Sequence, residues 1–413
     1  MSETAIIIGG GHATAELATS LRDQGWTGPI AVYTQENRFP YHRPPLSKAF
    51  MAGTTAAENL SIKQPAAYEK AAADFHFGVT VTAIDAAAHT ITLQDGSVVG
   101  YARLALATGS RARTLHVPGA EAAAHAANYL TLRTLEQAEA IRARLIPGAR
   151  VVVIGAGYIG LELAASAVGL GAHVTVIEAQ DRVLARVTGA EVSHFYEAAH
   201  RAAGVDLHLS TGVASLQVVD QRVTGVTLSN GAVVQADLVV VGVGVEPNTA
   251  LAAAAGLQID NGIAVDQFCR SSAADIVAAG DCTSHPSDLY GRRIRLESVP
   301  NALEQARTAA ATMNGKERAY QQAPWFWSDQ FDLRMKSVGL LQGYDQVVLR
   351  GDPATRSFCA FYLQGTRVLA VDTINRAPEF LLAKRIVAEQ LQIPAAVLAD
   401  DSTPLKEALP PAA

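Results

Sequence analysis

The sequence predicts an α/β fold with two Rossmann-like dinucleotide-binding domains and a smaller α+β domain at the C-terminal end. Two hydrophobic strands run into glycine-rich turns, in "TAIIIGGGHATAELA" at residues 4–18 and in "VVVIGAGYIGLELA" at residues 151–164. Strands alternate with helices after each turn, a pattern typical of parallel sheets covered on both faces. From Pro324 onward the chain becomes aromatic and rich in strand signals, which marks the third domain.

The first half of the chain starts with a βαβ unit. From Ala5 to about Gly28 the pattern is strand, turn and helix, and "PIAVYTQE" supplies a second strand that ends at Glu36. Short strands are expected near residues 75–84 and 90–93, with "LQDGS" as a hairpin turn, before "YARLALATGS" closes this part.

A second βαβ unit opens at Arg150 and ends in "HVTVIEA". Strands are expected at residues 205–209, 223–228 and 236–241, and again in "DIVAAGDCTSHP", followed by a helix in "PNALEQARTAAATM" with proline in its first turn. The last part reads as a hairpin in "FCAFYLQGTRVLAVDTI" and a helix over residues 378–391.

Composition limits the function. The 413 residues carry a net charge of −6, which gives no general attraction to nucleic acid. No apolar run is long enough for a membrane span and no signal region opens the chain, so we expect a cytoplasmic protein. Cys269, Cys282 and Cys359 are too scattered for a dithiol or an iron-sulfur cluster, and the histidines show no ligand spacing, so we assign no metal.

The second glycine turn has every part of a dinucleotide site. Gly155 permits the bend, Gly157 lets the backbone approach phosphate, and Gly160 lets the helix pack close to the strand. Glu178, at the tip of the next strand, can accept hydrogen bonds from both ribose hydroxyls and would repel the extra phosphate of NADP. NAD is therefore expected, although Arg182 and Arg186 lie nearby. Further candidates for this site are Tyr158, Ile159, Arg186 and Gly244.

The first glycine turn departs from the pattern. Gly9 and Gly11 serve the bend and the phosphate, but Thr14 stands where the third small residue belongs. At the strand tip Gln35 is followed by Glu36, so which side chain holds the ribose is open. Two dinucleotides in one chain are most economically a nicotinamide cofactor and FAD, because a flavin can accept a hydride and then release single electrons.

Several longer motifs carry a family resemblance. In "YHRPPLSKAFM", "LALATGS", "VAAGDC", "RLESVPNALEQAR", "PWFWSDQFD" and "FYLQGTRVLAVDTINRAPEF" the sequence resembles the oxygenase-coupled NADH:ferredoxin reductases, almost from end to end. The resemblance implies a flavoprotein with noncovalent FAD. It divides the chain into an FAD-binding domain at residues 1–112 and 245–322, an NADH-binding domain at 113–244, and a C-terminal domain at 323–413.

The resemblance also implies site residues. The expected FAD contacts, by motif position, are Gly9, Gly11, Ala13, Gln35, Glu36, Arg43, Lys48, Val81, Thr108, Gly109, Arg133, Asp281 and Val299. Asp281 at a strand tip can accept from ribitol hydroxyls, and the helix that begins in "SVPNA" can direct its positive end at the flavin. Family members pair a lysine and a glutamate beside the flavin, which implies catalytic roles for Lys48 and for Glu162, expected in the first turn of its helix.

The function expected from these features is electron transfer. NADH reduces FAD, and electrons then pass to a [2Fe-2S] ferredoxin that feeds a monooxygenase or dioxygenase. Alternatives are a reductase of rubredoxin or of a small molecule, and a non-catalytic interaction flavoprotein switched by NADH. Because such ferredoxins are acidic, a local cationic surface is expected to steer docking. The candidates are Arg292, Arg293, Arg295, Arg307, Arg334 and Lys336, with Trp327 either covering the flavin edge or buried in the core.

Overall fold

The computed structural model describes residues 3–409. The chain divides into two compact units. Unit 1 contains residues up to His42, then Glu58–Arg111 and Glu246–Pro324, and unit 2 contains Arg43–Ala57, Ala112–Val245 and the chain from Trp325 onward. The inclusion of Arg43–Ala57 in unit 2 was not predicted from the sequence. The split of unit 2 into an NADH-binding and a C-terminal domain stays a prediction.

Unit 1 is built on a parallel five-stranded sheet in the order β19-β7-β1-β2-β3. Its strands are β1 (Ala5–Ile8), β2 (Ile30–Thr34), β3 (Ala73–Phe77), β7 (Arg103–Leu106) and β19 (Ile276–Ala278). Strand β1 lies in the middle, and the chain leaves it first toward β2 and β3 and later reaches β7 and β19 on the other side. The carboxyl end of β1 is therefore the point where the strand order reverses, which is where ligands bind in such sheets.

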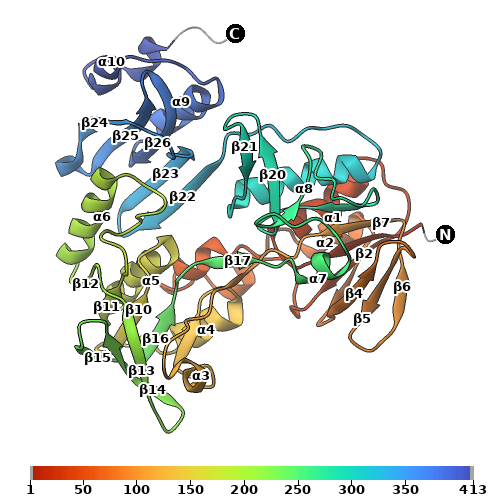
Figure 1. The fold of residues 1–413 in the computed structure, drawn as a ribbon, viewed down its shortest axis with the longest axis horizontal. Helices are drawn as coiled ribbons and strands as arrows, with labels where there is room; N and C mark the ends of the chain where they lie inside the picture. The colour runs from red at the N-terminus through yellow and green to blue at the C-terminus, as the bar shows by residue number, and fades with distance from the viewer. Residues whose placement is uncertain (1–2, 410–413) are drawn as a thin grey trace. The chain divides into compact units, whose positions relative to one another are not determined.

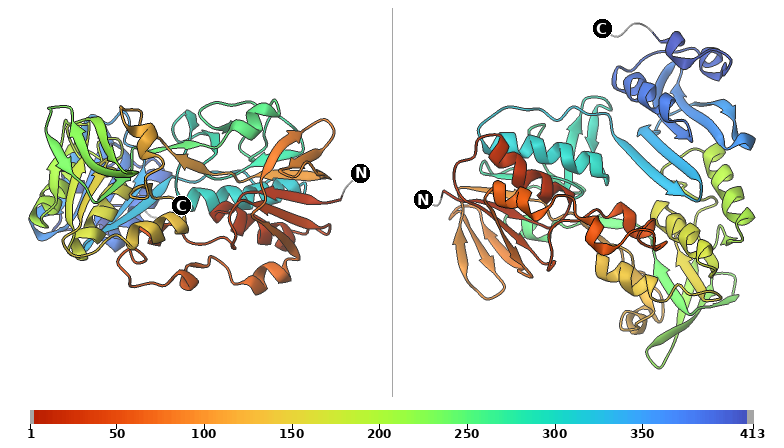
Figure 2. Two further views of the ribbon diagram at one scale, coloured as in Figure 1. Left: turned by 90° about the horizontal axis from the view of Figure 1, so that it is seen from below. Right: turned by 180° about the vertical axis from the view of Figure 1, so that it is seen from behind.

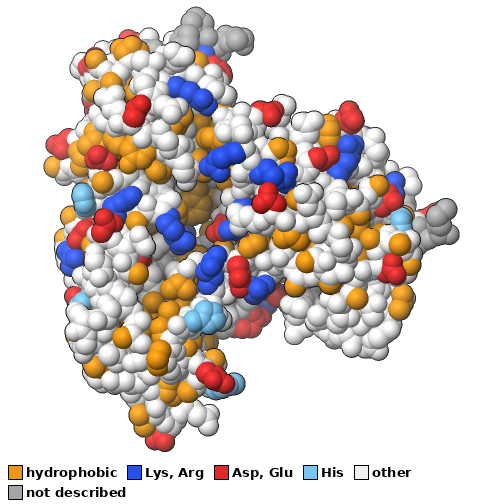
Figure 3. All heavy atoms as spheres, viewed as in Figure 1, with side chains coloured by type: hydrophobic (Ala, Val, Ile, Leu, Met, Phe, Trp, Pro, Cys, Tyr) orange, Lys and Arg blue, Asp and Glu red, His pale blue; other side chains and the backbone are white. Residues whose placement is uncertain are grey.

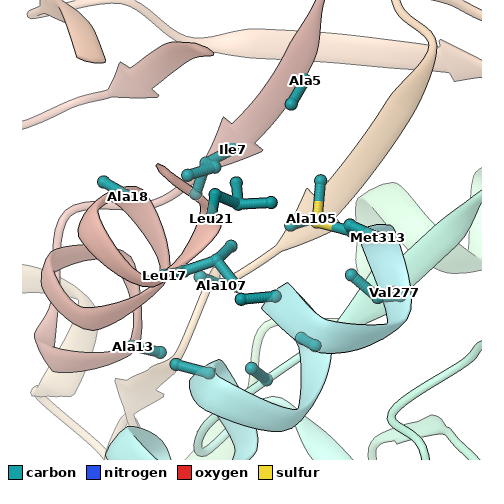
Figure 4. Packing of buried hydrophobic residues seen from close by; sticks show 14 of the residues in the cluster. Ala5, Ile7, Ala13, Leu17, Ala18, Leu21, Ala105, Ala107, Val277 and Met313 are labelled. Atoms are coloured by element: carbon teal, nitrogen blue, oxygen red, sulfur yellow. The ribbon is translucent and has the colours of Figure 1, made fainter. Parts of the chain in front are cut away.

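Two helices pack together on one face of this sheet. They are α1 (His12–Asp23) and α8 (Val299–Met313), which lie side by side in Figure 1 and in the right-hand view of Figure 2. Figure 4 shows Leu17 and Leu21 of α1 directed at the sheet strands and at Met313 of α8. Small residues such as Ala306 and Ala309 let the two helices approach closely, and both are fully buried.

Smaller elements complete unit 1. An antiparallel sheet contains β4 (Val81–Asp85), β5 (Thr90–Leu93) and β6 (Val98–Gly100), and another sheet contains β18 (Ile263–Ala264), β20 (Thr283–Ser287) and β21 (Arg292–Ile294). The remaining helices are α2 (Pro65–Lys70) and α7 (Ala250–Ala254), and β8 (Ser110–Ala112) pairs with β17 (Val245–Pro247). The stretch expected as one strand near residues 75–84 is two strands, β3 and β4, in different sheets.

Unit 2 repeats the parallel arrangement in the order β12-β11-β10-β16-β9. Its strands are β9 (Tyr129–Thr131), β10 (Arg150–Ile154), β11 (His173–Ile177), β12 (Asp206–His208) and β16 (Leu238–Val241). The helices of this part are α3 (Ala120–Ala123), α4 (Leu135–Arg142), α5 (Tyr158–Gly169) and α6 (Ala190–Ala202). An antiparallel sheet of β13 (Val213–Val219), β14 (Arg222–Leu228) and β15 (Val233–Gln235) is attached to it. Strand β10 is again central, so its carboxyl end is a second reversal point.

The last part of unit 2 is an antiparallel sheet in the order β22-β23-β26-β25-β24. It contains β22 (Trp325–Gln330), β23 (Leu333–Gly339), β24 (Gln346–Asp352), β25 (Ser357–Gln364) and β26 (Arg367–Ile374), followed by α9 (Ala377–Ala388) and α10 (Ala395–Ala399). The expected hairpin is β25 and β26. The predicted α/β class with two dinucleotide folds and an α+β C-terminal part is confirmed.

Candidate functional site

The first glycine turn has a bend that only glycine can adopt, followed by open space at the start of the next helix. Gly9 has a φ of 143°, and a Cβ there would lie 2.1 Å from the Ala107 carbonyl oxygen, so only glycine fits. Gly11 precedes α1, and a Cβ there would meet nothing within 4 Å. Backbone N–H groups at the start of a helix beside free space are the arrangement that a pyrophosphate requires. Ala13, on the first turn of α1, lies against Gly280, whose added Cβ would be 3.4 Å from that of Ala13.

Glu36 and Gln35 lie differently at the tip of β2. The Glu36 carboxylate accepts a hydrogen bond from the Tyr41 hydroxyl at 2.6 Å, and one of its oxygens is 3.9 Å from the Cβ position of Gly10 in the turn. Gln35 is exposed and donates its side-chain amide to the Thr80 hydroxyl at 3.4 Å. The carboxylate, and not the amide, therefore stands beside the glycine turn.

Asp281 follows β19 at the same edge of the sheet. Its Oδ2 accepts from the Ser110 hydroxyl at 3.1 Å, and the preceding Gly280 donates its N–H to Gln305 Oε1 of α8 at 2.8 Å. Helix α8 begins at Val299, where the Ser298 hydroxyl accepts from a backbone N–H of the first turn. The backbone before β8 contains Thr108 and Gly109, and the Thr108 hydroxyl donates to the Asn248 carbonyl at 2.9 Å. Val81 opens β4.

The second glycine turn, in unit 2, has the same construction. A Cβ at Gly155 would lie 2.5 Å from the Gly242 carbonyl oxygen, and one at Gly160 would lie 2.1 Å from the Gly155 carbonyl oxygen. A Cβ at Gly157, which precedes α5, would meet nothing within 4 Å. Glu178 at the tip of β11 accepts from the Ala156 N–H at 2.7 Å, so its carboxylate lies against the turn.

Side chains beside this turn differ in exposure, and Tyr158 is half-buried. Tyr158 packs its ring 4.5 Å from that of Phe326, and burial raises the pKa of its hydroxyl well above the ordinary value. Ile159 is 42% exposed. Arg186 is exposed. A Cβ added at Gly244 would lie 3.4 Å from a nitrogen of the Arg186 guanidinium, which is ordinary van der Waals distance.

Arg182 has a structural role instead. Its guanidinium donates to the Thr188 carbonyl at 2.9 Å, to the Ser193 hydroxyl at 2.6 Å and to the Ala185 carbonyl at 2.8 Å. These bonds hold the loop between β11 and α6. Its donors are directed at that loop, and so Arg182 is a poor candidate for a cofactor phosphate.

Lys48 and Glu162 form a buried ion pair. Lys48 Nζ lies 2.7 Å from Glu162 Oε2, and the glutamate side chain is only 2% exposed. Glu162 belongs to the second turn of α5, not to the first as predicted, because the helix already begins at Tyr158 directly after Gly157. Lys48 follows the short 3-10 helix η1 (Pro44–Ser47), which packs against α5. A carboxylate this deeply buried requires such a partner.

Two serines that the sequence did not identify complete this pair. Ser47 donates to Glu162 Oε2 at 2.5 Å, and Ser328 of β22 donates to Oε1 at 2.6 Å. Ser166 of α5 in turn donates to the Ser47 carbonyl at 2.8 Å, which ties η1 to the helix. Serine has no periodic or compositional signal for such a role. The one available hint was that Ser47 lies beside Lys48 in a recognised motif.

Two further expected FAD contacts lie in unit 2 with Lys48. Arg43 donates to the Arg133 carbonyl at 2.7 Å, and this bond joins the chain before η1 to the chain before α4. Arg133 itself donates its backbone N–H to Gln137 Oε1 at 2.8 Å, as part of the cap of α4. The Arg43 guanidinium and the Arg133 backbone are thereby held together before α4.

Comparison with known proteins identifies the chain. A family model described as "Pyridine nucleotide-disulphide oxidoreductase" matches residues 3–306, and one described as "Reductase C-terminal" matches residues 325–409. The chain belongs to the pyridine nucleotide-disulphide oxidoreductase family. Within this family it belongs to the oxygenase-coupled ferredoxin reductases that its motifs resemble, so that expectation is confirmed.

Relatives with 40% identity or more match nearly the whole chain. Putidaredoxin reductase CamA of Pseudomonas putida is 47% identical over 408 residues, which are 98% of this chain and 96% of that protein. The 5,5'-dehydrodivanillate O-demethylase ferredoxin reductase subunit of a Sphingobium species is 41% identical over 404 residues, 97% of each chain. The solved structure of a covalent putidaredoxin reductase–putidaredoxin complex matches with a TM-score of 0.95 at 47% identity, covering 98% of this chain and 97% of that one.

Membership in the family brings FAD and a nicotinamide dinucleotide as cofactors. The residues of the two turns fit such ligands, because Gly11 and Gly157 leave open space at helix N-termini and a carboxylate lies beside each turn. Within residues 3–409, no cluster of His, Cys, Asp or Glu could hold a metal ion, and no helix is long and apolar enough to cross a membrane.

The three cysteines take no part in disulfide chemistry, despite the family's name. All are buried and free. Burial raises the pKa of Cys269 and of Cys282 and raises that of Cys359 to about 12, so none is a reactive thiolate near neutral pH.

Proposed function

We propose that this flavoprotein ferredoxin reductase uses NADH and passes electrons through FAD to an acidic [2Fe-2S] ferredoxin. The observation that supports it best is the pair of glycine turns, each at a strand-order reversal and each with a carboxylate at the neighbouring strand tip. When bound, FAD supplies the chemistry that links a two-electron donor to a one-electron acceptor. The chain contributes binding, orientation and electrostatics.

The FAD contacts proposed in unit 1 centre on the first turn. Gly9 and Gly11 shape the pyrophosphate cradle, and Asp281 faces the same sheet edge with one oxygen held by Ser110. Between the two candidates at the tip of β2, the geometry favours Glu36 as the ribose ligand, since its carboxylate lies beside the turn. Tyr41 holds that carboxylate in place.

Glu178 is the proposed ribose ligand for the nicotinamide dinucleotide. Both of its oxygens accept backbone N–H groups, from Ala156 at 2.7 Å and from Gln180 at 2.8 Å, so the carboxylate is fixed beside the turn. A fixed negative charge at this place repels a 2′-phosphate. The nearby Arg182 cannot offset it without giving up its three bonds within the loop.

We expect NADH to reduce the bound flavin with a kcat/KM about 100-fold higher than NADPH, because like charges brought together cost several kcal/mol. Glu178→Ala should bring the ratio below tenfold, whereas Glu139→Ala, which removes an exposed carboxylate from α4, should leave it unchanged. Flavin bleaching in a stopped-flow spectrometer measures each rate. Equal use of both nucleotides by the unmodified protein would remove Glu178 from this role.

Lys48 is the proposed catalytic cation at the flavin, and Glu162 is the group that holds it. Glu162 is buried and Lys48 is only 15% exposed, so the ion pair holds the lysine ammonium in a preferred position against α5. Because Glu162 belongs to α5, the helix that follows the NADH turn, the lysine is joined directly to the nicotinamide side of the site. A fixed positive charge of this kind stabilises negative charge that develops during hydride transfer.

The candidate docking cations differ in how many ion pairs and hydrogen bonds they already make with neighbouring groups. Arg307 pairs with Glu16 at 2.7 Å and with Glu304 at 3.2 Å, and Arg295 pairs with Glu297. Arg293 donates to the Val265 carbonyl at 2.9 Å. These three side chains are occupied by neighbours within unit 1. Figure 3 likewise shows Lys and Arg mixed with Asp and Glu over the viewed face.

Lysines and aromatic rings gather instead where α9 packs against the C-terminal sheet. Lys384 Nζ lies 4.1 Å from the Trp325 ring centroid, and Lys336 Nζ lies 5.1 Å from that of Phe380. Trp327 is half-buried and lies directly opposite Lys336 in the pairing of β22 with β23. We name Trp325, Lys336 and Lys384, which are half-buried around the buried Phe380, the lysine–aromatic surface. Such a surface suits a partner that is acidic around an apolar centre.

We expect Arg334→Glu to raise the KM for ferredoxin roughly tenfold at low salt, because steering by local charge changes association rates by this order or more. Arg334 is exposed on β23, two residues before Lys336. Arg222→Glu, an equal change of charge on the exposed end of β14, is the control. The rate of flavin reduction by NADH should stay the same in both variants.

At physiological ionic strength the difference in the KM for ferredoxin between Arg334→Glu and the unmodified protein should be smaller, since the screening length falls to about 8 Å. If the rate of ferredoxin reduction changes neither with salt nor with Arg334→Glu, docking is mainly apolar. A protein that is bleached rapidly by NADH but transfers electrons to no ferredoxin would instead favour the interaction flavoprotein.

A further inference from the structure

The carboxylate of Glu162 is held on both oxygens by groups from two distant parts of the chain. Oε2 receives the Lys48 ammonium at 2.7 Å and the Ser47 hydroxyl at 2.5 Å. Oε1 receives the Ser328 hydroxyl at 2.6 Å, from the first strand of the C-terminal sheet. Ser328 is fully buried, so no solvent competes for this bond.

A chain of hydrogen bonds extends behind Ser328. Its hydroxyl accepts from Gln330 Nε2 at 3.1 Å, and Gln330 Oε1 is 2.8 Å from His200 Nε2 on α6. His200 is fully buried, and this burial lowers its pKa to about 4, so the imidazole is neutral near pH 7. Because its partner is an amide oxygen, Nε2 carries the proton.

Every bond in this chain therefore points the same way. His200 donates to Gln330, Gln330 donates to Ser328, and Ser328 donates to Glu162. Each donor polarises the next, so the hydroxyl of Ser328 is a stronger donor than an isolated serine. Because Gln330 donates to the Ser328 oxygen, the hydroxyl proton of Ser328 is directed at Glu162 Oε1.

We propose that Ser328 is a positioning residue for flavin reduction, because its hydroxyl fixes the Glu162 carboxylate and thereby the Lys48 ammonium. The inference rests on the proposed role of the Lys48–Glu162 pair. Without Ser328, Oε1 loses its donor in a dry environment, and the carboxylate can turn about its terminal bond. Lys48 then loses its single position, and a small displacement of a reacting group lowers a rate strongly.

The experiment compares limiting flavin reduction rates and NADH dissociation constants in FAD-loaded variants by stopped flow. Ser328→Ala should reduce the limiting rate about 10-fold, since hydrogen bonds to charged groups are among the stronger ones in proteins. The NADH dissociation constant should change less than twofold, which separates positioning from nucleotide binding. Thr373→Val removes another buried hydroxyl from the same sheet, one that donates to the Lys336 carbonyl at 3.0 Å, and should keep the normal rate.

A double-mutant cycle identifies the route of the effect. In a Glu162→Ala background, Ser328→Ala should cost less than an additional twofold, because there is no carboxylate left to position. If Ser328→Ala does not fold, Ser328→Cys keeps the size and offers only a weak S–H donor, and it should be slowed by a similar factor.

The possible results distinguish the proposed role of the Lys48–Glu162 pair from the inference about Ser328. A normal rate in Glu162→Ala itself would overturn the proposed role of the pair. A slow Glu162→Ala together with a normal Ser328→Ala and Ser328→Cys would overturn only the inference about Ser328. Independent, multiplicative losses in the double variant would show that Ser328 acts elsewhere.

Discussion

Replacing Glu162 with alanine is expected to slow the reduction of bound flavin by NADH about 100-fold, the loss typical of a misplaced reacting group. The carboxylate is 2% exposed and is the counter-ion of Lys48 at 2.7 Å. Its removal leaves the Lys48 ammonium and the hydroxyls of Ser47 and Ser328 without their common acceptor. The lysine is then free to shift, and the charge that we propose for the flavin site loses its fixed position.

FAD should stay bound in this variant, since the FAD contacts proposed for Glu36 and Asp281 are unchanged. The absorbance of the purified protein near the flavin maximum checks retention, and stopped-flow bleaching checks the rate. Glu162→Gln keeps the shape and loses the charge, and we expect it to be nearly as slow. Reduction at the unmodified rate in both variants would rule out the pair as part of hydride transfer.

Replacing Arg350 with methionine is expected to lower the free energy of unfolding of unit 2 by about 3–5 kcal/mol, because each carbonyl that loses its donor in the interior costs about 1–3 kcal/mol. Arg350 lies on β24 and is 2% exposed. Its guanidinium donates to the carbonyls of Leu398 at 3.3 Å and of Asp400 and Thr403 at 2.5 Å each. Methionine fills the volume but leaves these carbonyls without a donor.

Urea unfolding followed by circular dichroism measures the loss. Arg385→Met is the matched control, because Arg385 pairs with Glu389 on the surface of α9 and such a pair contributes less than about 1 kcal/mol. The chain beyond α9 should also become sensitive to protease in Arg350→Met, since Arg350 binds the segment Leu398–Thr403 to the sheet. Equal stability of the two variants would show that this segment is held by other contacts.

Local patterns in the sequence were enough for the two dinucleotide folds. A hydrophobic strand, a glycine turn and a helix are all encoded within about 15 consecutive residues, and so the order β1, turn, α1 and the order β10, turn, α5 lie where the sequence predicted them. The strand-tip carboxylate Glu178 was predictable for the same reason, because strand length sets its distance from the turn. The start of α5 was misjudged only because a helix can begin directly after Gly157.

The contacts that refine these sites depend on residues far apart in the chain. Ser47 and Ser328 are separated by 281 positions in the sequence, yet both donate to Glu162. Neither serine has a periodicity or a charge that would mark it, and a hydroxyl becomes a site residue only when folding buries it beside a carboxylate.

The sequence by itself determined the fold class, the two turns and the families of cofactors they accept. Only the tertiary structure placed the Glu36 carboxylate, and not the Gln35 amide, beside the first turn, engaged Arg182 in its own loop, and occupied Arg307 with Glu16 and Glu304. The physical reason is that the strand and helix periods fix where a side chain points, whereas its hydrogen-bond and ion-pair partners depend on which other segments fold against it.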